Sequence, residues 1–282
     1  MTKPALTADN SPLTFKMRYK MKILVTLFIM LAGFSLKGGD EFCNTRNTAF
    51  KNGEVVIMRV YYSTLGMFIG AGDASFTTTL EKFNGKPVFH CVGEGKSFPF
   101  FDNFFKVRDR YETYVDTVTM LPVKFIRNVS EGGYKAYNNV TFNRTARTAA
   151  TTKGLFQIPD CIQDVISATY YARNINFNNY KPGDKIPFDM FLDDEVYHLY
   201  LRYMGKETIK TRYGKFRSIK FKPLLIKGTM FEGGEKMNVW VSDDPNHIVL
   251  RVESPISVGS IKVDMMGYKN LRYPLTSLIN FR

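Results

Sequence analysis

Short strand-like segments, each followed by a turn signal, run along almost the whole chain, and this pattern limits the fold more than any other feature of the sequence. Valine, isoleucine, threonine and aromatic residues fill these segments, as is typical of strands. The sequence FNGKP at 83–87 carries the Asn-Gly signal of a tight hairpin between two of them. The predicted strands are 54–62, 70–80, 88–92, 107–115, 121–129, 134–142, 188–192, 195–204, 215–221, 236–241, 247–253 and 260–268.

The spacing of these strands decides how they pair. The connections are too short for the crossover helices that parallel strands need, so neighbouring strands must run antiparallel. We therefore predict a mainly β fold, in which a large antiparallel curled sheet, open or barrel-like, carries one packed α-helix. At 282 residues the chain can form one large β-rich domain, or two β halves that flank the helix.

The stretch DCIQDVISATYYARN, residues 160–174, is the segment that reads best as a helix. Asp160 follows a proline and can cap the first turn, and Gln163 stands three residues later, as in a capping box. Asn174 is a suitable residue at the C-terminal end of a helix. The β-branched residues and the two tyrosines would also suit another strand, but the capping pattern favours a helix at about 160–174 that packs against the curled sheet.

The N-terminus has the pattern of an export signal. Four cations, Lys16, Arg18, Lys20 and Lys22, precede an apolar stretch at 23–36. As a helix this stretch spans about 21 Å, which is shorter than the ~30 Å hydrocarbon core of a bilayer. We predict an upstream extension at 1–16, a signal peptide at 17–39 and one exported domain at 40–282. The exported domain would be periplasmic, soluble or peripherally associated with the envelope, without a permanent transmembrane segment.

Three cysteines remain in the predicted exported domain: Cys43, Cys91 and Cys161. An exported protein meets an oxidising compartment, so one disulfide and one buried thiol would be in order. Three buried thiols that act as small apolar side chains are the alternative. The sequence does not decide between the two, and it does not decide which cysteines would pair.

Composition and charge narrow the class of partner. The chain is 44% hydrophobic and 15% aromatic, which is too apolar for a disordered protein. Its net charge is +13, but lysine and arginine are scattered among acidic residues, without a basic helix or a long run of one sign. We read this as a solvated basic surface, with an anionic lipid or glycan of the cell envelope as the candidate partner and nucleic acid excluded.

Three segments resemble one family of exported bacterial proteins. They are QDVISATYYAR at 163–173, FFKVRDRYETYVD at 104–116 and MNVWVSDDPNHIVLRVESPISVGSIKVDM at 237–265. Together they are similar to domain of unknown function 3108, DUF3108, in its Bacteroidetes branch, over roughly 46–272. The resemblance implies a periplasmic, β-rich, barrel-like domain. It implies no activity and no catalytic residues.

The sequence RDRY at 108–111 is the densest polar cluster in an apolar neighbourhood. On a strand, Arg108 and Arg110 share one face, and Tyr111 lies on the other. The arginine pair could bind an anionic head group or a sugar acid. Cross-strand ion pairs on a solvated face are the simpler interpretation.

Aromatic residues supply the other candidates for ligand binding. The run FPFFDNFF at 98–105 could form core beneath a loop, or it could line or border a site for an apolar ligand. Trp240, next to two aspartates, could act as a sugar platform, although a strand that ends in a turn explains it more simply. The candidate ligand-binding residues are Phe101, Phe104, Arg108, Arg110, Tyr111, Tyr171 and Trp240.

The sequence offers little for catalysis. None of the three histidines has the spacing of HExxH, and GxSxG, CxxC and the phosphate-binding loop are absent. We therefore predict no cofactor, no metal and no catalytic residue. The leading hypothesis is a non-catalytic protein that binds an envelope amphiphile or glycan. An interaction module in envelope assembly is the alternative, and a hydrolase of envelope polymers is the third hypothesis.

Overall fold

The computed structural model describes residues 43, 45–64, 67–226, 233–256 and 259–281. Internal contacts divide the chain into two units, Met1–Gly38 and Gly39–Arg282, and all described residues belong to the second. The predicted upstream extension at 1–16 and the predicted signal peptide at 17–39 lie outside the described residues.

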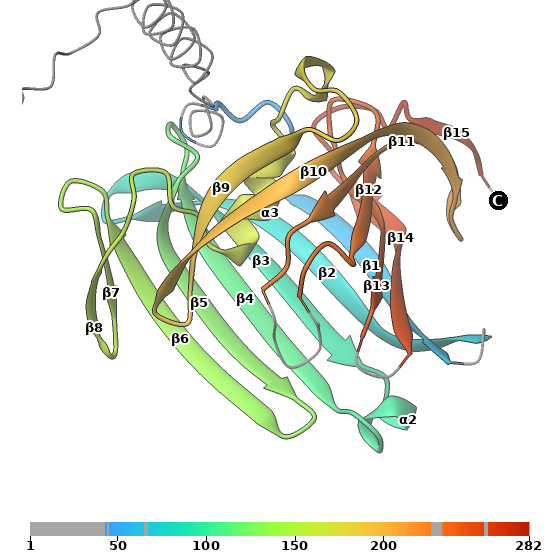
Figure 1. The fold of residues 1–282 in the computed structure, drawn as a ribbon, viewed down its shortest axis with the longest axis horizontal. Coiled ribbons are helices and arrows are strands. Elements are labelled where there is room, and N and C mark those ends of the chain that lie inside the picture. Colours follow the sequence, from blue (N-terminus) through green and yellow to red (C-terminus); the bar gives the residue numbers. More distant parts are fainter. Residues whose placement is uncertain (1–42, 44, 65–66, 227–232, 257–258, 282) are drawn as a thin grey trace, which may run out of the picture. The chain divides into compact units, whose positions relative to one another are not determined.

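Fifteen strands of the described residues form one sheet, and all paired strands are antiparallel (Figure 1). Their order is β8-β7-β6-β5-β4-β3-β2-β1-β14-β13-β12-β11-β10-β9, and β15 pairs with β11. Because β8 and β9 are its two edges, the sheet curls without closing, and the predicted fold class is confirmed. The strands are β1 (Glu54–Thr64), β2 (Met67–Phe83), β3 (Lys86–Ser97), β4 (Val107–Asp116), β5 (Pro122–Glu131), β6 (Tyr134–Asn143), β7 (Thr148–Thr151), β8 (Gly154–Gln157), β9 (Lys185–Leu192), β10 (Glu195–Lys210), β11 (Gly214–Pro223), β12 (Asn238–Ser242), β13 (Val249–Pro255), β14 (Ser260–Lys269) and β15 (Leu278–Phe281).

Two hairpin turns show why the strands connect so tightly. Asn84 and Gly85, between β2 and β3, have φ angles of 51° and 79°. Asp193 and Asp194, between β9 and β10, have φ angles of 52° and 67°. Two consecutive residues with positive φ give the turn whose twist matches that of paired strands, and asparagine, aspartate and glycine tolerate it best.

The main helix, α3 (Val165–Ala172), is shorter than predicted. Its N-cap is Asp164 rather than Asp160, because the Asp164 carboxylate accepts hydrogen bonds from the backbone N–H groups of Ile166 and Ser167 at 2.8 Å. The residues before it are extended, since Gln163 exchanges backbone hydrogen bonds with Asp189 and Phe191 beside β9. The predicted start at Asp160 and the capping box with Gln163 are therefore wrong.

Helix α3 lies inside the curl of the sheet, between β9 on one side and β3 and β4 on the other (Figure 1). Ile166, Tyr170 and Tyr171 are buried there. The Tyr170 hydroxyl is 2.9 Å from the Thr78 hydroxyl on β2, and the Thr113 hydroxyl on β4 donates to the Asp164 carboxylate at 2.6 Å. The helix therefore fixes the inner face of β2–β5 as the side that faces the core. Two short helical turns, α2 (Pro99–Asp102) and η1 (Phe177–Asn179), complete the described helices.

The β9–β10 hairpin covers the inner face of β5–β8 at the other edge of the sheet. Phe191 on β9 packs against the rings of Phe142 and Phe156, with ring centroids 6.1 and 5.8 Å apart. At the hairpin tip, Arg127 forms an ion pair with Asp193. Side chains from both layers fill the space between them, so the described part of the interior around α3 is core.

The cysteines follow the first of the two predicted alternatives. Cys43 and Cys161 form a disulfide, and Cys91 is a buried free thiol. The disulfide joins the beginning of the described chain to the segment just before α3. Burial raises the pKa of the Cys91 thiol well above its ordinary value, so this thiol is not a reactive nucleophile.

Candidate functional site

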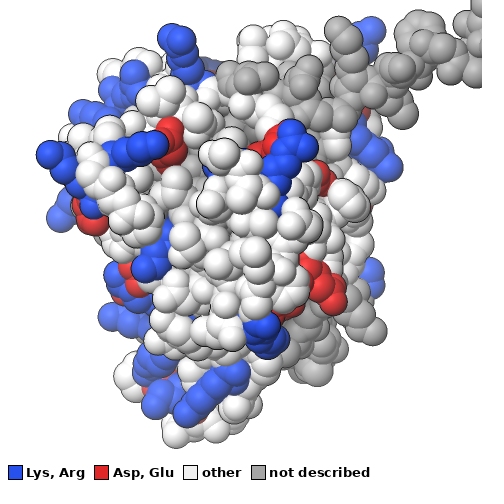
Figure 2. Space-filling model, turned by 90° about the vertical axis from the view of Figure 1, so that its left-hand side faces the viewer, with Lys and Arg blue, Asp and Glu red and all other residues white. Residues whose placement is uncertain are grey.

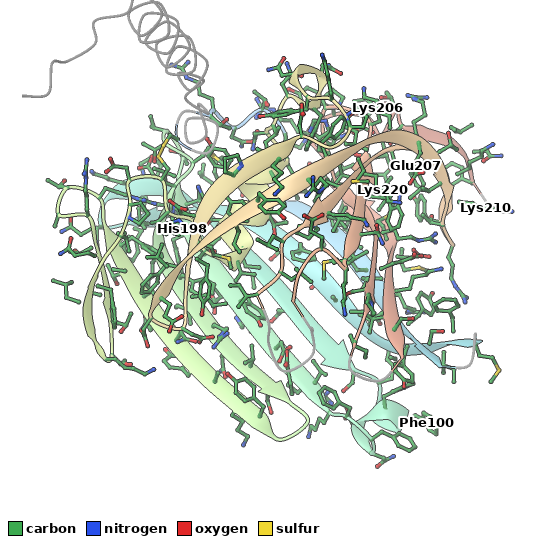
Figure 3. All side chains as sticks on the ribbon, viewed as in Figure 1. Phe100, His198, Lys206, Glu207, Lys210 and Lys220 are labelled. Carbon is green, nitrogen blue, oxygen red and sulfur yellow. A yellow bond between two sulfur atoms is a disulfide. The ribbon has the colours of Figure 1, made fainter. Side chains whose placement is uncertain are left out.

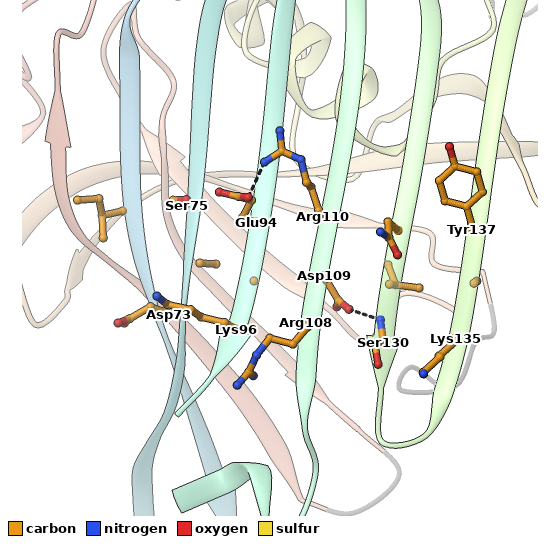
Figure 4. Close-up of a pocket in the computed structure, with 16 residues that line it drawn as sticks. Asp73, Ser75, Glu94, Lys96, Arg108, Asp109, Arg110, Ser130, Lys135 and Tyr137 are labelled. Carbon is orange, nitrogen blue, oxygen red and sulfur yellow. Dashed lines mark hydrogen bonds and ion pairs between the residues drawn. The ribbon is translucent and has the colours of Figure 1, made fainter. Parts of the chain in front are cut away.

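A groove with a volume of about 1150 Å³ crosses the outer face of β1–β6 (Figure 4). It runs across the strands rather than along them. Strands in a sheet lie about 4.8 Å apart, so a groove over six strands is roughly 24 Å long. A groove of this length suits an extended oligomer better than a single small molecule.

Strand register builds the two walls of the groove, because side chains in register on neighbouring strands line up in rows across a sheet. Arg108 and Arg110 are two residues apart on β4, so they contribute one side chain to each wall. Figure 4 shows the labelled side chains of the two rows pointing away from each other, with the strand backbones exposed between them. One wall consists of Asp73, Lys96, Arg108, Ser130 and Lys135, and the other of Ile57, Ser75, Glu94, Arg110, Asn128 and Tyr137.

The floor of the groove is the row of residues between the two walls. These residues are Ala74, Gly95, Asp109, Val129 and Ala136, which are in register with one another. Their side chains lie on the inner face of the sheet, because residues alternate between faces along a strand. A ligand in the groove would therefore lie against backbone between two rows of polar side chains.

Ion pairs hold the groove arginines in place. Arg110 contacts Glu94 across the strands at 2.5 Å and Glu112 on its own strand at 2.8 Å. These contacts, with Glu112 the stronger, raise the pKa of Arg110, and Arg110 in turn lowers the pKa of Glu112. Arg108 binds Asp102 of α2 at 2.6 Å, and its guanidinium lowers the pKa of that carboxyl. Both arginines are therefore charged and pre-positioned, as the cross-strand interpretation predicted.

The remaining cations of the groove are less constrained. Lys96 and Lys135 are exposed and form no ion pair with any residue that the structure describes. Elsewhere the surface is mixed: Figure 2 shows lysine and arginine spread over the side of the molecule nearest β7 and β8, with aspartate and glutamate between them. The groove thus offers two free positive charges beside paired ones.

The structure separates the predicted site residues into three places. Arg108 and Arg110 line the groove. Phe101 and Phe104 lie in and next to α2, below the end of the groove formed by Arg108, and Phe104 is 74% exposed. The interpretation of the aromatic run as buried core is thus wrong for Phe104.

The other three predicted residues face the core. Tyr111 is on the inner face of β4, half-buried, and burial raises the pKa of its hydroxyl. Tyr171 is fully buried, and its hydroxyl accepts a hydrogen bond from the backbone N–H of Thr45. Trp240 lies in the middle of β12 within a hydrophobic cluster. None of the three lines the groove, and ligand binding by them remains a prediction.

Sequence reasoning missed most of the groove. Glu94, Asn128, Lys135 and Tyr137 were not candidates, although each is a polar residue at alternate positions of a predicted strand. Alternation places such residues on a common face, but it does not reveal which strands are neighbours or in which register. The register of β3–β6 therefore had to be seen before these residues could be grouped.

Asp109, beneath the groove floor, leads to a prediction about pH. Burial and the neighbouring Glu131 carboxyl raise the pKa of Asp109 to about 7. An unfolded aspartate titrates near 3.9, so between about pH 4 and 7 the folded protein holds a proton that the unfolded chain has lost. Stability contributed by this group therefore falls as pH rises through that window.

We expect Asp109→Asn to raise the free energy of unfolding by about 1–2 kcal/mol at pH 8 and to leave it unchanged at pH 4. The full shift would give a larger value, which is reduced because the group is half-exposed and screened by solvent. Urea denaturation at both pH values measures the difference. Asp160→Asn, at an exposed carboxyl, is the control, and equal pH profiles for Asp109→Asn and the unsubstituted protein would contradict the prediction.

Cofactor and membrane features were searched in the same residues. No group of three or more metal-ligating side chains comes together among them. In the described part of the chain, none of the helices has the length and apolar character needed to cross a bilayer.

Comparison with known proteins agrees with the resemblance noted in the sequence. The family model described as "Protein of unknown function (DUF3108)" matches residues 58–266, which is most of the chain. The chain belongs to the DUF3108 family. A search of curated proteins found no match.

Solved structures similar to this DUF3108 chain support the fold alone. A β-barrel-like protein of domain of unknown function DUF1849 from Brucella abortus has a TM-score of 0.54 at 7% identity, over 79% of this chain and 99% of that one. A candidate lipoprotein from Parabacteroides distasonis gives 0.35 at 13% identity, over 80% and 99%. A candidate exported protein with a YmcC-like fold from Bacteroides fragilis gives 0.32 at 13% identity, over 80% and 99%.

Proposed function

We propose that this DUF3108 protein is an exported, non-catalytic protein of the cell envelope that binds an acidic glycan along the outer groove of β1–β6. The groove itself carries the proposal: it is long, it is open to solvent, and polar side chains line both of its walls. Because the described interior around α3 is filled by core side chains, the proposal places the ligand outside the sheet rather than inside its curl.

The chemistry of the walls favours a glycan over an apolar ligand. Arg108 and Arg110 are held in fixed positions, and a guanidinium can donate paired hydrogen bonds to a carboxylate. Lys96 and Lys135 add positive charge without an ion-pair partner among the described residues. Tyr137, which is 59% exposed, presents both a ring face and a hydroxyl. Hydroxyl-rich, negatively charged oligomers match this set.

The site within the cell follows from the chain's covalent chemistry. The disulfide between Cys43 and Cys161 is typical of proteins in an oxidising compartment. The basic and apolar pattern at 17–39 predicts export by a signal peptide. Both features support a periplasmic protein, soluble or peripherally associated with the envelope.

The arrangement of carboxyl groups favours binding without catalysis. A hydrolase needs two carboxyl groups that face a common substrate. Asp109 and Glu131 are neighbours and share the inner face of the sheet, opposite the groove. The groove acids Asp73 and Glu94 are each bound to an arginine. An interaction module in envelope assembly is the second candidate, and the exposed aromatic residues around α2 favour it.

Binding to an array of acidic bacterial polysaccharides tests the proposed function. We expect the labelled protein to bind at least one acidic glycan, and Arg110→Ala combined with Tyr137→Ala to weaken that binding at least about tenfold, or ~1.4 kcal/mol. Arg147→Ala, at an exposed ion pair outside the groove, is the matched control and should bind normally. If no acidic glycan binds, or if the groove variant binds as well as the control, the proposal is wrong.

A further inference from the structure

Large apolar side chains are exposed together at the end of the sheet that carries α2. Phe104 is 74% exposed, Phe100 66% and Met67 61%. Single exposed apolar residues are common on protein surfaces, but a cluster marks a place of interaction. We call this cluster the apolar end; it consists of Met67, Phe68, Ile69, Phe100, Phe104 and Phe105.

The apolar end is one surface, although it comes from two segments of the chain. The rings of Phe100, Phe101 and Phe104 lie 5.5–6.5 Å from one another. The Phe101 ring also lies 6.4 Å from the ring of Tyr62, and Tyr62 is paired with Ile69 across β1 and β2. Contacts therefore join α2 to the β1–β2 hairpin.

The outward orientation of these rings is fixed by the surrounding structure. Phe98 anchors α2, because its backbone N–H donates to Ala71 at 2.8 Å and its ring lies under the Arg59 guanidinium. Asp102 binds Arg108 and so ties α2 to β4. Figure 3 shows Phe100 projecting away from the sheet at this end. Several polar contacts therefore hold two phenylalanine rings in solvent, which a soluble surface without a partner would not need.

A basic pocket adjoins the apolar end. Its volume is about 270 Å³, and Phe68 forms part of its wall. Lys262 lies over the Phe68 ring at 4.2 Å, and Arg212 over the Tyr61 ring at 4.4 Å. Lys210 and Arg212 form no ion pair with the residues described by the structure. The lining thus combines two unpaired cations with an exposed aromatic ring; it consists of Tyr61, Phe68, Lys210, Thr211, Arg212, Arg251, Lys262 and Asp264.

Apolar tips beside unpaired cations match the chemistry of one partner, an anionic lipid surface. Aromatic side chains favour the boundary between head groups and acyl chains, and nearby cations are attracted to lipid phosphates. A protein partner would satisfy the apolar rings equally well, but it would not by itself call for unpaired cations next to them. Lys106, exposed beside Phe105, adds a further cation at the same place.

We propose that the apolar end docks on an anionic membrane surface, with Phe100, Phe104 and Met67 in the interfacial layer and the basic pocket around Arg212 on a lipid phosphate. This inference is independent of glycan binding, because no residue of the apolar end lines the outer groove. The groove would remain open to solvent while the protein is docked.

Vesicle flotation of the full chain, expressed with its own N-terminus and purified from the exporting cells, tests this inference. Vesicles of phosphatidylcholine, with and without phosphatidylglycerol, are the probes. We expect binding that is stronger with phosphatidylglycerol, and about a tenfold or greater loss in Phe100→Ser combined with Phe104→Ser. Lys210→Ala combined with Arg212→Ala should remove the preference for phosphatidylglycerol.

Matched controls separate docking from general effects on the protein. Leu155→Ser, at an apolar residue of β8 that is 67% exposed, should bind vesicles normally. Arg110→Ala in the groove should also bind vesicles normally, so failure of docking and failure of glycan binding are distinguishable. In Phe104→Trp, the new fluorescence should shift to shorter wavelength on vesicles. The inference is overturned if the unsubstituted chain does not float with anionic vesicles, or if the phenylalanine variant floats as well as Leu155→Ser.

Discussion

Replacing both Cys43 and Cys161 by serine is expected to lower the free energy of unfolding by about 4 kcal/mol. The two cysteines are 118 residues apart, and a cross-link that closes a loop of about this length removes much of the conformational entropy of the unfolded chain. Local contacts should keep the folded state intact, because the backbone N–H groups of Thr48 and Ala49 still donate to the Asn174 side chain. Guanidinium denaturation of the two proteins measures the difference.

Reductant supplies the control for this substitution. It should lower the stability of the unsubstituted protein by a similar amount and leave the double serine variant unchanged, because Cys91 is not in a disulfide. Equal denaturation midpoints with and without reductant would contradict the expected role of the disulfide.

Replacing Arg173 by methionine is expected to cost about 3–5 kcal/mol of stability, because it leaves the Glu54 carboxylate buried without its partner. Arg173 forms two hydrogen bonds with Glu54, at 2.5 and 3.0 Å, and both side chains are almost fully buried. Its guanidinium also donates to the Asn246 carbonyl at 3.0 Å and lies 5.4 Å from the centre of the Phe50 ring. Arg173 thus joins the end of α3 to β1 and to the loop before β13.

Two further variants identify the cause. Arg173→Met combined with Glu54→Leu should recover a large part of the loss, because no unpaired charge is then buried. Arg147→Met, which breaks the exposed ion pair with Asp160, should change stability by less than about 1 kcal/mol. If the single Arg173 variant were as stable as the Arg147 variant, the buried pair would not hold α3 in the curl. Urea denaturation at neutral pH measures all three.

Local signals in the sequence were sufficient for the class of fold. Turn residues such as Asn84-Gly85 and Asp193-Asp194 mark where strands reverse, and they adopt the predicted backbone geometry. The four-residue strands β7, β8 and β15 were missed, because segments so short carry too little alternation to be recognised. The start of α3 was placed four residues early, because the pairing of Gln163 with β9 is a contact between segments that are distant in the sequence.

The candidate site was less accessible from the sequence. Alternation correctly placed Arg108 and Arg110 on one face of a strand, opposite Asp109 and Tyr111. The partners that complete the groove, Glu94 and Tyr137, come from other strands, and only the register of the sheet brings them together. The pairing of Cys43 with Cys161 was equally hidden, since it depends on where the curled sheet places the segment before α3.

Mass spectrometry of the small molecules that co-purify with the exported protein tests the central proposal most directly. The protein would be isolated from the periplasm under native conditions, beside a folded variant with Arg110→Ala and Tyr137→Ala. We expect a stoichiometric acidic glycan on the unsubstituted protein and its loss from the variant. A protein free of glycan, or equal amounts of glycan on both proteins, would contradict glycan binding in the outer groove.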